Sequence, residues 1–323
     1  MIQERLKALR AEMEKRGITV YVVPTADFHE SEYVGDHFKA RKFITGFTGS
    51  AGTAVITLDE AGLWTDGRYF VQAENQLKDS TVTLYRMGED GVPTVDEFVK
   101  DRLKEGGCLG FDGRVVNGTW GGRLEKIAAE KNASMHVTED LIDLIWEDRP
   151  ALSKQPLFIL EEKYSGKSTA DKIADLRKAM KENGADVHIL TSLYDIAWLL
   201  NIRGDDIDYV PVVLSYLVLT ETECIWFLQE EVVDDKIRAY LNENHITTKP
   251  YDAIYDYVPE IPADAVVLMN RGTVNYRIVN SLNKAIKVVD KPNPTELMKA
   301  VKNKTEVDNT RAAHVKDGVA FTK

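Results

Sequence analysis

The chain contains the same helix-and-strand pattern twice, and this repeat is the sequence feature that most restricts its fold. In the first copy, apolar residues at helical spacing lead to a glycine and then to an apolar run at 18–24, and the second copy follows 167 residues later. A helix, a turn and a buried strand are therefore predicted at the start of each half. The matched positions are Leu6 with Ile173, Leu9 with Leu176, Met13 with Met180 and Gly17 with Gly184.

The similarity continues beyond this first unit. Arg10 and Arg177 are also 167 residues apart, and in each half an apolar segment with a glycine-containing bend precedes two β-rich stretches. A short polar turn between these stretches would join them as a hairpin. The sequence therefore predicts an internal duplication of one α/β domain, with a mixed β-sheet flanked by helices in each copy.

Prolines mark the expected domain boundaries. Helical material is expected at 124–133 and 141–150, and the proline-containing linker 150–158 follows, so the first domain is predicted at 1–155 and the second at 156–292. Pro292 and Pro294 prevent a continuous helix, and Thr295 is the predicted cap of a new one. Residues 293–323 are then helical in composition, but the apolar side with Val315 and Val319 lacks a partner, so we expect the chain to be truncated there.

Composition restricts the function classes. The 44% hydrophobic content is sufficient for two cores, and the net charge of −11 disfavours binding to nucleic acid or to an anionic membrane. The only cysteines, Cys108 and Cys224, are outside any CxxC spacing and are expected to be reduced and buried. The charged N-terminus lacks the apolar core of a secretory signal, so a cytoplasmic location is expected.

Three motifs together carry a family resemblance. They are RKFITGFTGSAGTAVIT (41–57) with WTDGRYF (64–70), DIAWLLNIRGDDIDYVPV (195–212) and KAVKNKTEVDNTRAAHVKDGVA (299–320). In this order they resemble cytosolic, three-domain Xaa-Pro aminopeptidases, also called aminopeptidase P, over nearly the whole chain. WTDGRYF by itself would also fit prolidases and creatinases.

This resemblance implies two creatinase-like N-terminal domains that precede a metal-binding catalytic domain. In the family, the third domain holds two divalent metals, manganese or zinc, which activate water to attack the bond before proline. Residues 293–323 resemble the lead-in helices of that domain, and no segment matches its metal ligands. We therefore expect no cofactor in this fragment, which should be inactive alone. The expected partners are a peptide with proline at its second position and the missing catalytic domain, in a parent that is a homodimer.

Arg68 and Arg203 are the two predicted substrate-binding residues. Arg68 in WTDGRYF matches a family arginine that contacts the peptide, and a guanidinium suits a carbonyl or carboxylate because it offers paired, charged donors. The structural alternative is an ion pair with Asp66. Arg203 lies beside Gly204 and a cluster of aspartates and could face the same cleft, whereas the alternative is that these charges hold a bend in the chain.

Other candidates favour structural interpretations. The segment 29–37 (HESEYVGDH) lacks the spacing of a metal site and is expected to be a surface loop. The glycine-rich segment 46–54 lacks the P-loop pattern, and its glycines are expected to allow a tight turn between strands. Ser50 lacks the sequence context of a nucleophile. Trp64, Trp146, Trp198 and Trp226 are expected to pack in the cores.

Three functions remain open from the residues. The first is the non-catalytic N-terminal part of a metal-dependent Xaa-Pro aminopeptidase, whose domains shape the substrate cleft and support assembly. The second is a prolidase or creatinase-type hydrolase, which the complete second copy disfavours. The third is a binding protein of the same fold that has lost its metal ligands, such as a chaperone.

Overall fold

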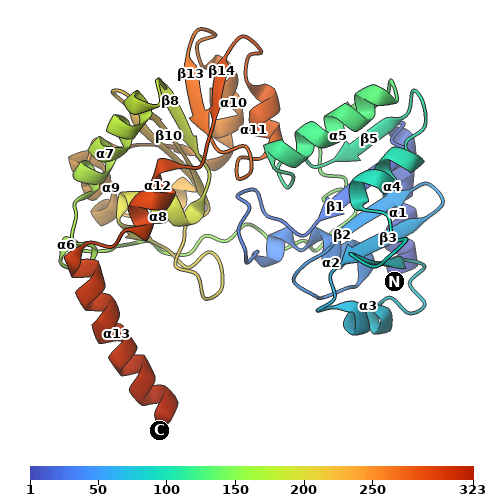
Figure 1. Cartoon of the computed structure of the whole chain (residues 1–323), viewed down its shortest axis with the longest axis horizontal. Coiled ribbons are helices and arrows are strands. Elements are labelled where there is room, and N and C mark those ends of the chain that lie inside the picture. The colour runs from blue at the N-terminus through green and yellow to red at the C-terminus, as the bar shows by residue number, and fades with distance from the viewer. The chain divides into compact units, whose positions relative to one another are not determined.

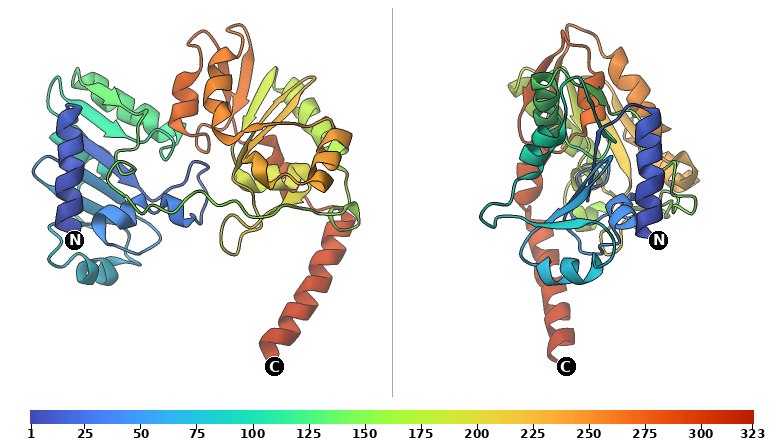
Figure 2. Two further views of the ribbon diagram at one scale, coloured as in Figure 1. Left: turned by 180° about the vertical axis from the view of Figure 1, so that it is seen from behind. Right: turned by 90° about the vertical axis from the view of Figure 1, so that its right-hand side faces the viewer.

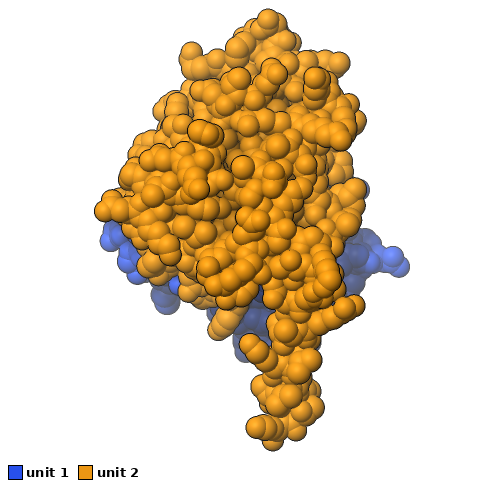
Figure 3. All heavy atoms as spheres, turned by 90° about the vertical axis from the view of Figure 1, so that its left-hand side faces the viewer, with its two compact units in different colours: residues 1–152, 271–280 blue, residues 153–270, 281–323 orange.

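The computed structural model describes all 323 residues, which divide into two compact units. Unit 1 comprises residues 1–152 and 271–280, and unit 2 comprises residues 153–270 and 281–323 (Figure 3). The domain boundaries at 155 and 292 stay predictions. No feature of the sequence indicated that residues 271–280 belong with unit 1. No helix is both long enough and apolar enough to cross a bilayer.

Unit 1 is built on a six-stranded mixed sheet with the strand order β4-β3-β2-β1-β5-β6 (Figure 1). The hairpin β2–β3 and the pair β1–β2 are antiparallel, and the remaining neighbours are parallel. The strands are β1 Val20–Pro24, β2 Thr53–Thr57, β3 Ala61–Thr65, β4 Thr83–Arg86, β5 Cys108–Phe111 and β6 Ser134–His136. The helices are α1 Ile2–Lys15, α2 Ala40–Thr45, α3 Phe70–Gln76, α4 Val95–Arg102, α5 Gly118–Glu130 and α11 Tyr276–Ser281, with the 3₁₀ turn η1 Asp36–Phe38.

Both faces of the unit 1 sheet are covered because the central strand β1 is apolar on both sides. Val20 and Val22 pack with side chains from α4 and α5, whereas Tyr21 and Val23 pack with α1 and α2. Such a continuous apolar run is typical of a strand buried on both faces. The segment 141–150, which was expected to be helical, instead forms turns. Its apolar residues Leu141 and Ile142 still enter the core.

Unit 2 repeats this sheet with the strand order β12-β11-β10-β8-β13-β14 and the same pairing directions. The strands are β8 Val187–Leu190, β10 Ser215–Thr220, β11 Cys224–Leu228, β12 Thr247–Pro250, β13 Val266–Met269 and β14 Lys287–Asp290, and β7 Phe158–Ile159 pairs with β9 Ile202–Arg203 in a small second sheet. The helices are α6 Glu162–Ser165, α7 Thr169–Glu182, α8 Leu193–Leu200, α9 Asp235–Glu243, α10 Ile254–Tyr257, α12 Pro294–Ala300 and α13 Lys304–Thr322, with 3₁₀ turns η2 Glu230–Val232, η3 Tyr251–Ala253 and η4 Val258–Glu260.

The two sheets confirm the predicted pair of mixed α/β domains, and the repeat extends to single contacts. The matched apolar residues of α1 and α7 are all buried. Arg10 donates from Nε to the carbonyl of Thr57 at 2.9 Å, and Arg177 donates from Nε to the carbonyl of Thr220 at 3.0 Å. Both carbonyls lie at the end of the strand that begins the hairpin, so each arginine fastens the first helix of its copy to the same point of the sheet.

The end of unit 2 differs in detail from the sequence prediction. Asn293, not Thr295, is the N-cap of α12, and Pro294 occupies the first helical position. Proline suits that position because the first helical N–H has no partner within the helix. The following helix, α13, buries none of its residues and extends away from the rest of unit 2 in both views of Figure 2. Its apolar residues Val315, Val319 and Phe321 are exposed.

Residues 271–280 join unit 1 through reciprocal hydrogen bonds with the start of α5. Asn117 and Asn275 form an antiparallel bridge, and each caps its own helix with its side chain, α5 and α11 respectively. Two pairs of backbone hydrogen bonds are also reciprocal. In the first pair, the N–H of Gly118 donates to the carbonyl of Val274 at 2.8 Å and the N–H of Tyr276 to the carbonyl of Val116 at 2.7 Å. In the second pair, the N–H of Thr119 donates to the carbonyl of Arg271 at 3.0 Å and the N–H of Arg277 to the carbonyl of Gly113 at 2.9 Å.

Candidate functional site

Arg68 lies in the turn between β3 and α3, where the chain leaves the sheet. Its Nε and Nη2 donate to the two carboxylate oxygens of Asp66 at 2.8 and 2.9 Å, and its backbone N–H donates to the same carboxylate at 3.1 Å. The Arg68 side chain is 70% exposed, so the paired charges face solvent. The guanidinium holds the pKa of Asp66 at about 2, below its ordinary value. Arg68 thus forms the ion pair with Asp66 that was the alternative to substrate binding, but the pair lies at the surface, where a ligand can still reach the guanidinium.

The glycine-rich loop at 46–52 lies beside this turn and is fixed by a buried arginine. Arg41 is 4% exposed and has no carboxylate partner; it donates to the carbonyl of Phe47 at 2.5 Å and to that of Gly49. Burial lowers the pKa of Arg41 to about 10. The hydroxyl of Ser50 is hydrogen-bonded to that of Tyr69 at 2.6 Å, and the guanidinium of Arg68 lies over the Tyr69 ring, 5.2 Å from its centre. The loop is therefore a rigid support for the Arg68 turn.

A second Asp-Gly-Arg sequence in unit 1 forms the same local ion pair in a buried setting. Arg114 donates to Asp112 from its backbone N–H at 2.9 Å, from Nε at 3.0 Å and from Nη2 at 3.0 Å. Asp112 is 3% exposed, and the Arg114 guanidinium lies 4.4 Å from the ring centre of Phe28. The Asp-Gly-Arg sequence therefore forms the ion pair in both turns. The two turns differ in burial: the pair of Arg114 is largely buried, whereas that of Arg68 is exposed and accessible to a ligand.

Most of the segment 29–37 lies at the surface as predicted, with Glu30, Glu32, Tyr33 and Asp36 exposed, and His29 is its one buried residue. His29 is 2% exposed, and the carboxylate of Asp27, itself buried, accepts hydrogen bonds from the backbone of His29 and Ser31. Nowhere in the structure do three or more histidine, cysteine, aspartate or glutamate side chains gather as they would around a metal ion. The residues present therefore do not form a dinuclear metal site.

Arg203, the second predicted site residue, lies in β9 of unit 2. Its Nη1 donates to the carbonyls of Ala197 and Ile202, which leaves Nε and Nη2 without a protein partner. Burial lowers its pKa below the ordinary value, while Glu306 opposes that shift. In the neighbouring aspartate cluster, Asp206 accepts from the backbone of Gln155 and Leu214, so this carboxylate does hold the local chain path.

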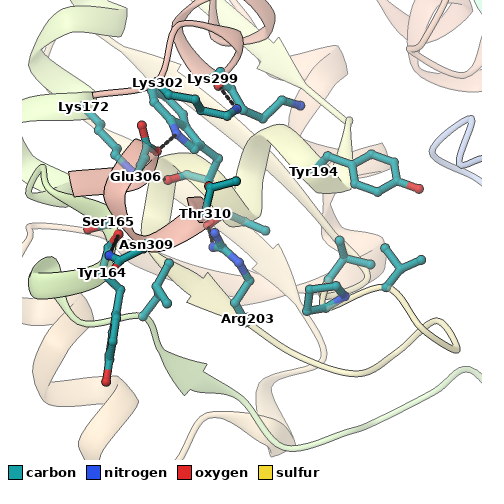
Figure 4. A pocket seen from close by; sticks show the side chains of 16 residues that line it. Tyr164, Ser165, Lys172, Tyr194, Arg203, Lys299, Lys302, Glu306, Asn309 and Thr310 are labelled. Carbon is teal, nitrogen blue, oxygen red and sulfur yellow. Dashed lines mark hydrogen bonds between the residues drawn. The ribbon is translucent and has the colours of Figure 1, made fainter. Parts of the chain in front are cut away.

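A pocket of about 520 Å³ opens beside Arg203, entirely within unit 2 (Figure 4). Its wall contains four cationic side chains and one carboxylate, together with aromatic and aliphatic residues. The lining residues are Leu160, Tyr164, Ser165, Lys172, Tyr194, Ala197, Trp198, Arg203, Val210, Pro211, Val212, Lys299, Lys302, Glu306, Asn309 and Thr310. This volume lies within the usual range of small-molecule sites.

Lys172 is the least exposed cation of this pocket. It is 1% exposed, and its Nζ donates to the carbonyl of Trp198 at 2.9 Å and to Oδ1 of Asn201 at 2.7 Å. Burial lowers the pKa of Lys172 to about 8. Sequence reasoning missed this residue, although a lysine four positions before Leu176, on the apolar face of a helix, is a signal in itself. Trp198, expected in the core, lies at the boundary between the core and this pocket.

The remaining charges of the pocket come from α12, α13 and the turn between them. Lys299 is paired with the buried Asp195 at 2.6 Å. Glu306 accepts from the backbone of Asn303 at 2.9 Å as part of a capping box and lies 3.4 Å from Nε1 of Trp198. Lys302 is exposed and donates to the carbonyl of Lys299. Glu306 is thus the single carboxylate on the wall and forms no ion pair there.

Family models for the creatinase/prolidase N-terminal domain match the chain twice, over residues 5–145 and 148–306. Full-length relatives include the probable Xaa-Pro aminopeptidase P of Neurospora crassa, 38% identical over 99% of this chain, and that of Laccaria bicolor, 39% identical over 99%. The alignment covers 48% and 50% of these two proteins. The chain therefore spans about half the length of the curated relatives it matches.

The crystal structure of X-prolyl aminopeptidase from Caenorhabditis elegans, described as a cytosolic enzyme with a di-nuclear active site, matches 99% of this chain and 55% of its own. The TM-score is 0.93 at 31% sequence identity. Sheet order, repeated contacts and both sets of comparisons agree. The chain belongs to the creatinase/prolidase N-terminal domain family and consists of two such domains of the Xaa-Pro aminopeptidase P type.

Proposed function

We propose that this chain is the non-catalytic N-terminal part of a metal-dependent aminopeptidase that removes the residue before a proline. The observation that carries the proposal is the alignment of 99% of the chain with about half of each Xaa-Pro aminopeptidase P. The two units contain no cluster of metal ligands, which favours a non-catalytic role for both of them. In this proposal the two domains shape the substrate cleft and support assembly, and the remaining half of the parent supplies the chemistry.

The parent enzyme is proposed to act on peptides with proline at the second position. By the same reasoning it binds two divalent ions, manganese or zinc, in its catalytic domain and acts as a cytoplasmic homodimer. These ions would supply an activated water and stabilise the charge on the attacked carbonyl. In this proposal the remaining half of the parent holds them, since the side chains of this chain form no group of three or more ligands that could hold a metal ion.

Arg68 is the residue proposed to contact the peptide. Its guanidinium is exposed, and its turn is supported by the loop that Arg41 fixes. Asp66 accepts from one edge of the guanidinium and pre-orients it, which leaves Nη1 for a carbonyl or carboxylate of the substrate. For Arg203 a peptide contact stays a prediction, and its bonds to two neighbouring carbonyls support a local role equally well.

The deciding experiment uses the longer parent enzyme with Arg68→Ala and, as its matched control, Arg114→Ala from the second Asp-Gly-Arg turn. Loss of a charge-assisted hydrogen bond to substrate should lower kcat/KM by roughly one to two orders of magnitude in Arg68→Ala, with unchanged metal content. Arg114→Ala should lower stability instead. Near-normal kinetics in Arg68→Ala would reject its role in binding.

A second experiment tests the division of labour. The 323-residue chain, incubated with manganese or zinc and a peptide that has proline at its second position, should release no N-terminal residue. Turnover that survives repurification would contradict the proposal. Translating the parent reading frame beyond residue 323 separates the alternatives, because a metal-free binding protein of this fold would lack the metal ligands that the aminopeptidase needs.

A further inference from the structure

The pocket of unit 2 has an excess of positive charge. Lys299 is neutralised by Asp195, so three cations remain, Lys172, Arg203 and Lys302, and the wall offers them only Glu306. None of these three forms an ion pair with a carboxylate of this chain. Lys172 is buried and Arg203 half-buried, so holding these two side chains charged without a counterion is costly, and a bound anion would offset that cost.

The free donors of Arg203 are directed into the pocket. Nη1 is occupied by two carbonyls, which fixes the plane of the guanidinium and leaves Nε and Nη2 as a parallel pair. Figure 4 shows the guanidinium pointing toward α13, where Asn309 and Thr310 offer further polar groups. A planar pair of donors on a fixed guanidinium matches the two oxygens of a carboxylate or phosphate.

The buried Lys172 adds a further positive charge to the electrostatic field inside the pocket. Its Nζ lies 4.3 Å from the ring centre of Trp198 and is held by two oxygen acceptors, so its charge cannot move out toward solvent. The lowered pKa of Lys172 has the same origin, because burial penalises the charged form. A fixed charge in a region of low dielectric acts on a nearby ligand more strongly than a solvated one.

The rest of the wall suits an apolar group. Trp198, Tyr164 and Tyr194 contribute aromatic surface, and Leu160 and Pro211 contribute aliphatic surface. Small-molecule sites typically combine such walls with a few well-placed polar groups that fix orientation. A bare inorganic ion would use only the cationic part of this volume.

We propose that this pocket binds a small organic oxyanion, with its carboxylate or phosphate group at the free Nε and Nη2 of Arg203, its apolar part against Trp198 and the neighbouring wall, and Lys302 adding positive charge elsewhere on the wall. The inference does not depend on the proposed peptidase function, because site and readout both belong to this chain.

The test is calorimetric titration of the 323-residue chain at low salt with phenyl phosphate, benzoate, inorganic phosphate and phenol. At least one of the two aromatic anions should bind with a dissociation constant of about 1 mM or below, more tightly than phenol and inorganic phosphate. The two aromatic anions distinguish a phosphate from a carboxylate ligand. Added salt should weaken binding because the interaction is electrostatic.

Three variants locate the site. Arg203→Met should weaken binding at least about tenfold because it removes the paired donors, and Lys302→Met should weaken it about fivefold because it removes a positive charge from the wall. Lys236→Met, at an exposed lysine of α9 outside the pocket, is the matched control and should bind as the parent does. Lys302 is exposed, so its variant remains informative even if Arg203→Met impairs folding.

Two outcomes would overturn the inference. The first is that neither aromatic anion binds more tightly than phenol. The second is binding that Lys302→Met leaves unchanged relative to Lys236→Met, since the anion would then be held elsewhere on the chain.

Discussion

Two adjacent glycines in α5 should respond to alanine in opposite directions. At Gly121 an added Cβ would lie 2.1 Å from Cδ2, 2.4 Å from Cγ and 2.8 Å from Cβ of Tyr276, which is 3% exposed. At Gly122 the nearest atom is the terminal Nη2 of Arg271, 4.0 Å away. A methyl group at Gly121 would therefore overlap the first carbons of the buried Tyr276 side chain, whereas at Gly122 it would meet only the far end of the Arg271 side chain.

The expected free energies follow from two opposing effects. Alanine in place of glycine stabilises a helix interior by about 1 kcal/mol, and Gly122→Ala should gain roughly that amount. Overpacking a filled core costs about 1–3 kcal/mol, and Tyr276 cannot rotate away because its Cβ and Cγ are themselves in the contact. With an overpacking cost of about 2 kcal/mol, Gly121→Ala should therefore lose about 1 kcal/mol net, which places the two variants about 2 kcal/mol apart.

Urea unfolding of the chain measures these differences, and amide hydrogen exchange in peptides from α5 assigns the transition to unit 1. The double variant Gly121→Ala/Tyr276→Ala should cost less than the sum of its parts, because the smaller side chain relieves the contact. A Gly121→Ala chain as stable as the parent, or equal shifts for both glycine variants, would refute the packing described for α5 and residues 271–280.

Further predictions concern buried charges and thiols. In the 323-residue chain, Arg114→Ala should cost about 3 kcal/mol in urea unfolding because it leaves a buried carboxylate unpaired, while Arg68→Ala leaves the midpoint unchanged; equal effects would contradict the assigned burial. Burial lowers the pKa of Lys172 to about 8 from 10.5, so the unfolded chain binds more protons between these values and stability should rise with pH across that window, a rise that Lys172→Met abolishes in unfolding curves. Both cysteines are buried, and burial raises the pKa of Cys224 to about 12, so mass spectrometry should detect alkylation at pH 8 only after unfolding.

The repeated architecture was accessible from sequence because local patterns determine it. The helical spacing of Leu6, Leu9 and Met13 and its recurrence 167 residues later predicted both helices and both first strands. The β-rich stretches likewise became the hairpins β2–β3 and β10–β11. Here hydrophobic periodicity and tertiary burial act in the same direction, which is the situation in which sequence reasoning is most reliable.

The errors arose where tertiary contacts outweigh local signals. The charged segment 29–37 lies at the surface as predicted except at His29, which is buried where the side chain of Asp27 satisfies the backbone of the turn. Residues 141–150 have an apolar content typical of a helix, but turns suffice to insert Leu141 and Ile142 into the core.

The candidate sites were only partly predictable for a related reason. Arg68 was found by its motif, but its exposure could not be read from a sequence that Arg114 shares at a buried position. The pocket beside Arg203 combines residues from five helices and the strand β9, separated by up to 150 positions along the chain. No local pattern records that Lys172 and Glu306 line the same volume.

The exchange of bonds between Asn117 and Asn275 has an evolutionary consequence. Contacts in which residue i meets j while j meets i characterise the interface of a twofold-symmetric dimer. Here the same reciprocal pattern lies within one chain, and all of these residues belong to unit 1. A gene cut at the linker 150–158 would therefore remove Tyr276 from the core of unit 1, so the two halves of the chain cannot be inherited separately without loss of that packing.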